Sequence, residues 1–499
     1  MARTLLVWGT SSGAGKSLLS AALCRWAAQR GIDVAPFKAQ NMSNNARVVP
    51  GLDGGWGEIG SAQFFQARAA RVEPTVDMNP VLLKPERDTA SQVVLHGQVE
   101  PALSRLPWRE RSAQLALAAH ESFLRLHAAH ELLVVEGAGS PAEINLAAQD
   151  YVNLGTARWA RDCGEMRALL VTDIDRGGAF AHLHGTWSLL PADLRPALAG
   201  FVLNKFRGDA SLLAPAPAQL QALTGVPTVA VLPMRRDHGL PDEDGIFDTA
   251  ATAPAGPGLR VAVVATPAIS NLDEFQALRE VPGLRLVWAR RASELVGADW
   301  VVLPGSKQVS GDLAWLRGRG IDGAITRHAA AGGRVLGLCG GLQMLGEVLS
   351  DADGVDGEAC ESLPGLGLLP LHTHHAWPKH VRATRARFAQ VDAPWQGLSG
   401  IESEAYEIRT GRTTPQPQAV GLRPVLFDSN GEVLGWQRGP VLGLGTHGLF
   451  ESPAVMHALF GTQVTTLDAR LDGLAELVDR HFEPGVLQTC LGGGARAGF

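Results

Sequence analysis

Several features that define whole classes of protein are missing from this sequence. It contains no apolar stretch long enough to span a bilayer, and no signal-peptide-like segment precedes the first predicted strand. Its five cysteines are odd in number and never form a CxxC pair, which argues against a disulfide framework and a structural zinc site. Long basic runs are also missing and the net charge is −6, so neither nucleic acid nor an anionic membrane is expected as a main partner. These absences predict a cytoplasmic enzyme or switch, whose oligomeric state the sequence leaves open.

What is present predicts more than one α/β domain. With 499 residues, the chain is too long for a single hydrophobic core. In the first half, short apolar runs alternate with segments of helical period, which predicts a parallel sheet covered by helices on both faces. The predicted strands are 4–9, 33–38, 132–136, 168–173, 199–204 and 228–233, and the clearest predicted helices are 17–30 and 111–127.

A segment rich in alanine, proline and glycine separates this half from a second series of strands. Residues 250–258 have the composition of an interdomain linker. The next predicted strands are 260–265, 285–289, 300–304 and 334–338. The predicted organisation is an N-terminal domain over 1–249, a linker over 250–258, a second α/β domain over 259–485 and a flexible tail over 486–499.

A glycine-rich loop follows the first predicted strand and leads into the first predicted helix. It reads Gly-Thr-Ser-Ser-Gly-Ala-Gly-Lys-Ser over residues 9–17. Backbone N–H groups of such a loop face the phosphates of ATP, while Lys16 would reach the outer phosphates and the Ser17 hydroxyl would reach Mg²⁺. Thr10 stands where the usual P-loop has its first glycine, and Gly9-Thr10 with Gly15-Lys16-Ser17 instead resembles the dethiobiotin synthetase variant of the loop. The ATP-binding candidates of the loop are Thr10, Gly13, Gly15, Lys16 and Ser17. The alternative is a glycine-rich turn with an incidental lysine.

Two other predicted strands end on polar residues that suit a nucleotide site. Glu136 lies at the carboxyl end of one strand, the edge of an α/β sheet where ligands gather, and its carboxylate suits Mg²⁺ beside phosphates. Asn204 ends another strand, where its side-chain amide could read the edge of adenine. A solvated glutamate before a turn and an asparagine that caps a turn are the alternatives.

The second half contains a cysteine in a sharp strand-to-helix turn. Residues 335–346 read Val-Leu-Gly-Leu-Cys-Gly-Gly-Leu-Gln-Met-Leu-Gly, an apolar strand that runs through Cys339 into an amphipathic helix. The flanking glycines let the backbone turn sharply and expose the thiol, and a helix N-terminus favours the thiolate. Such a nucleophile would attack the side-chain amide of glutamine, form a thioester and release ammonia. The alternative is a buried structural cysteine.

Two further segments could complete this chemistry. His447, about a hundred residues downstream, is the predicted base, and backbone N–H groups of Gly305 and Gly340 are the predicted oxyanion hole. Class I amidotransferases usually carry His-x-Glu, but here Leu449 occupies the glutamate position and Glu451 lies two residues further on. Either another group orients His447 or the site works as a Cys339–His447 dyad, and the dyad with a dispensable Glu451 is the working hypothesis.

Four stretches together resemble the cobyric acid synthase family of cobalamin biosynthesis over almost the whole chain. They are Phe-Lys-Ala-Gln-Asn-Met-Ser-Asn-Asn at 37–45, Glu-Gly-Ala-Gly-Ser-Pro-Ala-Glu-Ile-Asn-Leu at 136–146, Asp-Ile-Asp-Arg-Gly-Gly at 173–178 and Tyr-Glu-Ile at 406–408. The resemblance implies an N-terminal dethiobiotin synthetase-like domain and a C-terminal class I glutamine amidotransferase domain. It also implies amidation of the b, d, e and g carboxylates of adenosylcobyrinic acid a,c-diamide, with ATP and glutamine consumed at each step.

The same resemblance suggests which residues meet the substrate. Lys38 matches the lysine that meets the acidic substrate in dethiobiotin synthetases, and Glu136 matches a Mg²⁺ carboxylate. The remaining substrate-binding candidates are Asn41, Asn44, Asn45, Glu143 and Asp173. For the three asparagines, a loop rich in Asx-turns is the alternative.

Two other functions remain open at this level. Cobyrinic acid a,c-diamide synthase would carry out the same two chemistries on different carboxylates. A partitioning-type switch ATPase would share the phosphate loop but would leave Cys339, Gly305 and His447 unexplained.

Overall fold

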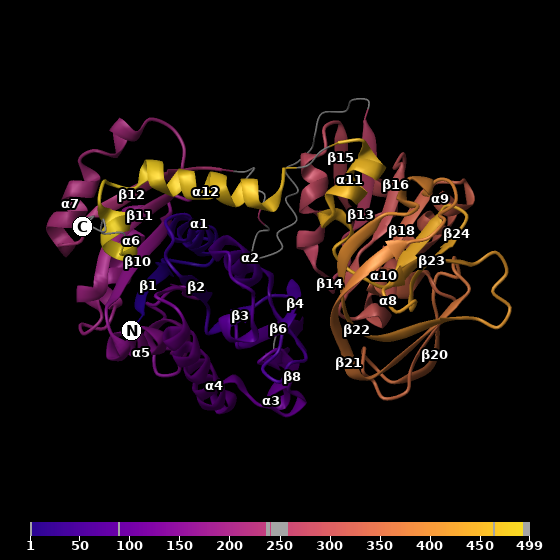
Figure 1. Ribbon diagram of the computed structural model, residues 1–499, viewed down its shortest axis with the longest axis horizontal. Helices are drawn as coiled ribbons and strands as arrows, with labels where there is room; N and C mark the ends of the chain where they lie inside the picture. The colour runs from indigo at the N-terminus through magenta and orange to yellow at the C-terminus, as the bar shows by residue number, and fades with distance from the viewer. Residues whose placement is uncertain (1, 88–89, 236–239, 241–257, 463–464, 493–499) are drawn as a thin grey trace. The chain divides into compact units, whose positions relative to one another are not determined.

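The computed structural model describes all residues except 1, 88–89, 236–239, 241–257, 463–464 and 493–499. The described chain forms two compact units, coloured along the sequence in Figure 1. The first unit comprises residues 1–43, 49–244 and 466–499, and the second comprises 44–48 and 245–465. Among the described helices, none combines the length and apolar character that crossing a membrane requires.

A six-stranded sheet in the order β12-β11-β10-β1-β9-β2 forms the centre of the first unit, and all its neighbouring strands are parallel. The strands are β1 (Arg3–Gly9), β2 (Val34–Phe37), β9 (Leu132–Glu136), β10 (Met166–Asp173), β11 (Leu198–Phe206) and β12 (Thr228–Pro233). Their apolar side chains are buried on both faces, as expected for a parallel sheet between two layers of helices. Each predicted strand of this half is present, with ends that differ by at most two residues.

Helices cover both faces of this sheet. One face carries α4 (Trp108–Ala129), α5 (Thr156–Cys163), α6 (Ala179–Leu189) and α7 (Ala216–Thr224). The other face carries α1 (Lys16–Gln29) together with two helices from the end of the chain, α12 (Leu467–His481) and α13 (Val486–Leu491). The unit also contains α2 (Ser61–Ala70), α3 (Pro101–Arg105) and a small sheet of β3 (Gln40–Met42), β6 (Val81–Arg87), β7 (Ala90–Leu95) and β8 (Gln98–Val99).

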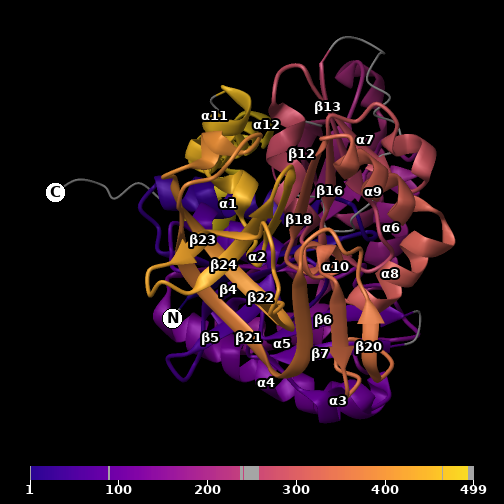
Figure 2. The same cartoon turned by 90° about the vertical axis from the view of Figure 1, so that its right-hand side faces the viewer.

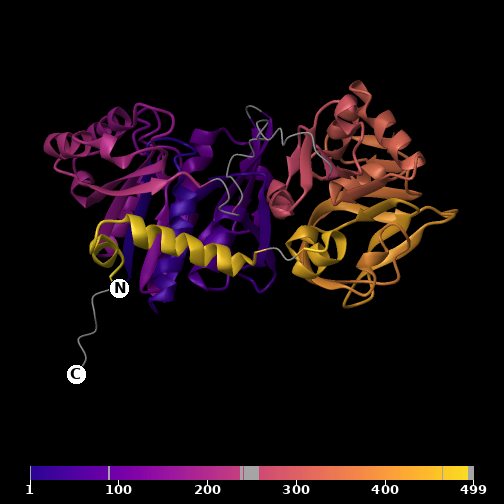
Figure 3. The ribbon, with the colours of Figure 1, turned by 90° about the horizontal axis from the view of Figure 1, so that it is seen from above.

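The C-terminal helices correct the predicted domain boundary. Figures 1 and 3 show α12 lying along α1, and its Leu471, Leu474 and Val478 are buried in the core of the first unit. The indole N–H of Trp26 in α1 donates to Asp479 across 2.7 Å. The second domain therefore does not extend to 485, and 486–491 form a packed helix where a flexible tail was expected. The predicted linker lies outside the described residues except for Gly258.

The second unit contains a larger mixed sheet in the order β15-β13-β16-β18-β25-β24-β23-β21-β19-β20, with β22 paired to β21. Its parallel part consists of β13 (Leu259–Val264), β15 (Leu284–Ala289), β16 (Trp300–Leu303), β18 (Arg334–Leu338) and β25 (Val441–Leu444), which confirms the strands predicted for this half. The remaining strands are β19 (Val348–Asp351), β20 (Cys360–Pro364), β21 (Leu371–Phe388), β22 (Glu402–Pro415), β23 (Arg423–Asp428) and β24 (Val433–Arg438). These strands extend the sheet mainly by antiparallel pairing, which the sequence reading did not specify.

Figure 2 is viewed from the side of this unit and shows helices packed against its sheet. One face carries α8 (Val309–Gly318), α9 (Ile321–Ala330) and α10 (Gly340–Leu345). The other face is covered by the 3₁₀ segment η5 (Leu272–Glu280) and by α11 (Pro453–Phe460). A second 3₁₀ turn, η8 (Leu449–Glu451), precedes α11. In each unit the carboxyl ends of adjacent parallel strands lie along one edge of the sheet, and both candidate sites are built there.

Candidate active site

The phosphate loop lies at the carboxyl end of β1, where the sequence predicted it. Lys16 is 2% exposed, and its Nζ donates to the carbonyl oxygens of Ser11 at 3.1 Å and Gly139 at 3.3 Å. Gly15 has φ 99°, and a Cβ at this position would lie 2.0 Å from Nδ2 of Asn204. Only glycine therefore fits at this point of the loop. The loop and the N-terminus of α1 present the backbone arrangement that binds phosphates.

Glu136 is the centre of a buried polar cluster next to the loop. Its side chain is fully buried, and its Oε1 accepts hydrogen bonds from Ser17 Oγ at 2.9 Å and Lys38 Nζ at 2.7 Å. The amides of Gln63 and Gln66, one turn apart on α2, donate to Oε2. The four donors compensate the buried carboxylate. Strands β1, β9 and β2 are neighbours, so Ser17, Glu136 and Lys38 converge although they are far apart in sequence.

Asn204 and Asp173 stand on the other side of the loop, at the ends of β11 and β10. The Asn204 amide donates to the Ala14 carbonyl at 2.9 Å, so it supports the loop directly. Lys205 has φ 61°, and its Nζ donates to the Gly13 carbonyl at 2.7 Å and to Asp173 at 3.0 Å. Adenine recognition by Asn204 and substrate binding by Asp173 stay predictions, while the contacts show that both residues help to shape the loop. Thr10 bonds Thr172 through their hydroxyls at 3.0 Å.

The other substrate-binding candidates are divided between the two units. Asn41 is buried beside the cluster, and its Nδ2 donates to Gln63 at 3.2 Å. Glu143 is exposed on a turn. Asn44 and Asn45 belong to the second unit, where the Asn45 carboxamide oxygen accepts from the Leu272 backbone N–H at 2.9 Å. Substrate binding by the three asparagines stays a prediction, while Asn45 also accepts a hydrogen bond from the first residue of η5.

In the second unit, Cys339 occupies a strained turn between β18 and α10. Its backbone has φ 49° and ψ −105°, which a residue with a side chain rarely adopts. The Cys339 N–H donates to the Leu444 carbonyl of β25 at 2.7 Å, which holds the elbow against the neighbouring strand. A Cβ at Gly340 would lie 2.6 Å from the backbone nitrogen of Ser306, so the Gly305–Ser306 turn and the elbow are in close contact.

His447 lies beside this elbow because β25, which precedes it, is paired with β18. A Cβ at Gly305 would lie 2.7 Å from Cε1 of His447, so this imidazole lies against the Gly305–Ser306 strand that also contacts the elbow. Nδ1 of His447 is 3.1 Å from Oε2 of Glu274, whose Oε1 accepts from the N–H groups of Gly448 and Leu449. The expected dyad is therefore wrong as a description of the geometry: Glu274 supplies the third group.

Charge neighbours set the protonation of His447. Burial by itself lowers the pKa of this imidazole, but the Cys339 sulfur and the Glu274 carboxylate favour the charged form more strongly, and the pKa of His447 rises to about 10. At neutral pH the ring is therefore an imidazolium. Its Nδ1–H faces Glu274, and its other side faces the cysteine.

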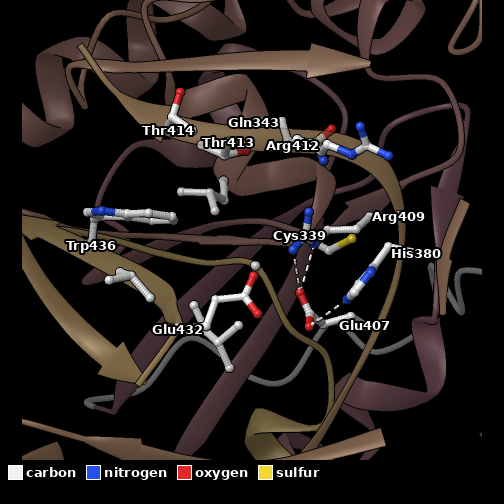
Figure 4. Close-up of a pocket in the computed structure, with 14 residues that line it drawn as sticks. Cys339, Gln343, His380, Glu407, Arg409, Arg412, Thr413, Thr414, Glu432 and Trp436 are labelled. Atoms are coloured by element: carbon white, nitrogen blue, oxygen red, sulfur yellow. Dashed lines mark hydrogen bonds and ion pairs between the residues drawn. The ribbon is translucent and has the colours of Figure 1, made fainter. Parts of the chain in front are cut away.

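A cavity of about 240 Å³ opens next to Cys339, and Figure 4 shows the side chains that line it. Gln343 of α10, four residues after the cysteine, contributes an amide, while Arg409, Arg412 and Glu432 contribute charges. Glu407 is fully buried, and its ion pairs with Arg409, Arg382 and His380 hold its pKa at about 2 despite the opposing effect of burial. The cavity therefore joins a nucleophile to charged groups that suit a zwitterionic amino acid.

Sequence reasoning missed Glu274, Gln63, Gln66 and Gln343. The i, i+3 spacing of the two α2 glutamines places them on one helix face, and Gln343 follows the elbow by one turn. These spacings could have indicated all three residues from the sequence. Glu274 lies 173 residues before His447, and the sequence offered only an acidic pair after a strand. Its position beside His447 depends on η5 packing with η8 on one face of the sheet.

Comparison with known proteins agrees with this geometry. A family model described as a CobB/CobQ-like glutamine amidotransferase domain matches residues 260–455. A second, described as a CobQ/CobB/MinD/ParA nucleotide binding domain, matches residues 5–245. The predicted fold class is thus confirmed: the chain combines a P-loop nucleotide-binding domain with a glutamine amidotransferase domain in one α/β enzyme.

Relatives that align along nearly the full length of the chain identify the family within this class of enzyme. Cobyric acid synthase of Methylibium petroleiphilum is 60% identical over 496 residues, covering 98% of this chain and 97% of the relative. Those of Variovorax paradoxus and Leptothrix cholodnii are 60% and 58% identical, each over at least 97% of both chains. The chain belongs to the cobyric acid synthase family of glutamine-dependent amidotransferase ligases, which confirms the resemblance found in the sequence.

Proposed function

We propose that this enzyme amidates the b, d, e and g side-chain carboxylates of adenosylcobyrinic acid a,c-diamide to give adenosylcobyric acid. The observation that carries the proposal is the pairing of two sites in one chain. One is a phosphate loop beside a buried Lys38–Glu136 pair, and the other is a Cys339–His447–Glu274 arrangement with a cavity next to the sulfur. The first suits activation of a carboxylate and the second suits release of ammonia from glutamine.

Carboxylate activation is assigned to the first unit. The substrate carboxylate would attack the γ-phosphorus of ATP, ADP would leave, and the resulting acyl phosphate would accept ammonia while phosphate departs. Lys16 would bind the transferred phosphoryl group, and Lys38, held at 2.7 Å from Glu136, would bind the substrate carboxylate.

The oxygen donors next to the loop fit a magnesium ion. Ser17 Oγ and Glu136 Oε1 lie 2.9 Å apart, and Mg²⁺ beside phosphates needs only one or two protein oxygens. These two oxygens, next to the phosphate loop, are the ligands we assign. Bound there, the ion would neutralise phosphate charge.

Ammonia release is assigned to the second unit. The Cys339 sulfur would attack the carboxamide carbon of glutamine, and the His447 imidazolium would give its proton to the departing ammonia. Water would then hydrolyse the thioester to glutamate. N–H groups at Gly305 and Gly340 are assigned to the developing oxyanion. In the cavity, Arg412 is assigned to the α-carboxylate of glutamine and Glu432 to its α-ammonium group.

Product analysis tests the proposal as a whole. Purified enzyme, ATP, Mg²⁺ and glutamine should convert adenosylcobyrinic acid a,c-diamide through successive amidations to a product with four more amides, seen by mass spectrometry. Omission of ATP should stop all of them. Cobyrinic acid offered in its place tests the a,c-diamide synthase alternative, and preferential amidation of its a and c groups would overturn the proposal.

The orienting role of Glu274 gives a prediction about rate and pH. Glu274→Gln keeps the shape but removes the charge that holds the imidazolium, so the glutamine-dependent rate should fall by about 10². The same change should lower the pKa of His447, because the carboxylate is one cause of its rise. The alkaline limb of the rate–pH profile should therefore move to lower pH.

Glu451→Gln is the matched control, since Glu451 is the acidic residue nearest the position where the family pattern has its glutamate. Its Oε1 pairs with Arg47 at 2.5 Å and not with His447. The rate loss in Glu451→Gln should be clearly smaller, and its pH profile should stay in place. Equal losses in both variants would show that Glu274 is not the orienting group.

A further inference from the structure

We propose that Arg47 is a positioning residue for the glutaminase site, through which a short segment of the N-terminal half of the sequence holds the His447–Glu274 pair in place. The inference rests on the proposed role of Cys339 and His447. Residues 44–48 fold with the second unit, although the chain before and after them belongs to the first.

Arg47 is 2% exposed and bridges η5, which contains Glu274, and η8, which begins two residues after His447. One end of its guanidinium forms a buried ion pair with Asp273, the residue before Glu274 in η5. The other end pairs with Glu451 in η8, at 2.5 Å. Glu274 itself bonds the backbone at the start of η8, through Gly448 and Leu449. Arg47 therefore links η5 to η8, the same two segments that the Glu274 carboxylate connects.

The same guanidinium reaches the ring that packs on the catalytic imidazole. Its carbon lies 5.1 Å from the ring centre of Tyr406, and the Tyr406 ring stacks on His447 with centres 5.3 Å apart. The backbones of Tyr406 and His447 exchange two hydrogen bonds, at 2.9 and 3.3 Å. His447 is thus flanked by Glu274 on one side and Tyr406 on the other, and Arg47 contacts the supports of both.

Neighbouring contacts fix the segment that carries Arg47. The Asn45 carboxamide oxygen accepts from Leu272 N–H at 2.9 Å, and Asn271 Nδ2 donates to the Ala46 carbonyl at 2.9 Å. Asn271 Nδ2 also donates to the Tyr406 hydroxyl at 2.8 Å. The start of η5, two residues before Glu274, is therefore bonded to the two residues that directly precede Arg47.

Charge explains why an arginine is needed at this place. Asp273 and Glu274 are both buried, and Glu451 approaches them from η8. Without the guanidinium, the buried carboxylate of Asp273 would lose its counter-charge, and the acidic groups of η5 and η8 would repel each other. The two segments would separate, and Glu274 would move relative to Nδ1 of His447. A displacement of about 1 Å in a catalytic group can cost up to about 10² in rate.

Steady-state kinetics of the full-length enzyme test the assignment. For Arg47→Ala we expect kcat with glutamine to fall by about 10 to 10² while KM for glutamine stays close to normal, since Arg47 does not line the cavity. Synthesis from ammonium should keep its wild-type rate. In Arg47→Lys the positive charge is kept, but the lysine can reach only one of the two carboxylates. Its kcat should therefore lie between those of the wild type and Arg47→Ala. Arg423→Ala, which removes an ion pair with Asp392 elsewhere in this unit, should have wild-type kinetics.

The outcomes separate this inference from the proposed function. Wild-type kcat with glutamine in Arg47→Ala, or equal losses with glutamine and ammonium, would overturn the positioning role. If Arg47→Ala is not recovered folded, Arg47→Lys decides: a lowered kcat at normal KM supports the inference, and wild-type kcat overturns it. Failure of the proposed function would appear separately, as glutamine-dependent synthesis that survives in Cys339→Ala.

Discussion

Cys339→Ala should abolish glutamine-dependent synthesis while synthesis from ammonium continues. The substitution removes the only nucleophile assigned to the glutamine amide, and loss of a nucleophile typically costs about 10⁴ or more in rate. Free ammonia can still attack the acyl phosphate, because ATP and the corrinoid are assigned to the other unit. Amide formation should be measured with glutamine, and separately with a high concentration of ammonium at raised pH, where more of it is unprotonated.

Cys360→Ala is the matched control for this variant. Cys360 is half-buried in β20, outside the lining of the cavity, and its replacement should leave both rates unchanged. Full glutamine-dependent activity in Cys339→Ala would show that the elbow does not carry the glutaminase reaction. Loss of both activities would instead indicate that the substitution damages the fold or the transfer of ammonia.

Lys16→Ala should stop synthesis from glutamine and from ammonium alike. Lys16 is the buried cation of the phosphate loop, and carboxylate activation precedes the use of ammonia from either source. Loss of one preorganised electrostatic contact to a reacting group typically lowers the rate by about 10²–10³. The measurement is the rate of ADP and amide formation with each nitrogen donor, at saturating ATP.

Arg30→Ala is the control, because it removes another cation from the end of the same helix. Arg30 is the C-terminal cap residue of α1 and pairs with Asp479 at 2.8 Å in a partly exposed ion pair, which typically contributes about 0–1 kcal/mol to stability. Its replacement should leave synthesis intact. Near-normal ammonium-dependent synthesis in Lys16→Ala would contradict an ATP site at this loop.

The local motifs could be predicted from the sequence because each depends on residues adjacent along the chain. The phosphate loop needs a strand, a run of small residues and a helix in direct succession, and residues 3–29 form that succession. The elbow at Cys339 likewise needs flanking glycines, and a Cβ at Gly340 would meet Ser306. The parallel strands were also predictable, since buried β-strands have continuous apolar sequence.

The residues and helices that pack against these motifs depend on the tertiary fold, in particular on how the segments after each strand pack and on where the C-terminal helices return. Glu274 meets His447 across 173 residues because η5, which follows β13, packs with η8, which follows β25, on the same face of one sheet. The amphipathic sequence of α12 indicates one buried face, but it cannot say which sheet that face covers, and the helix packs on the first unit. The sequence by itself thus determined the family and predicted the two chemistries and their central residues. Tertiary structure alone decided which distant carboxylate lies against the histidine, because ion pairs and helix packing depend on proximity in space and carry no fixed spacing along the chain.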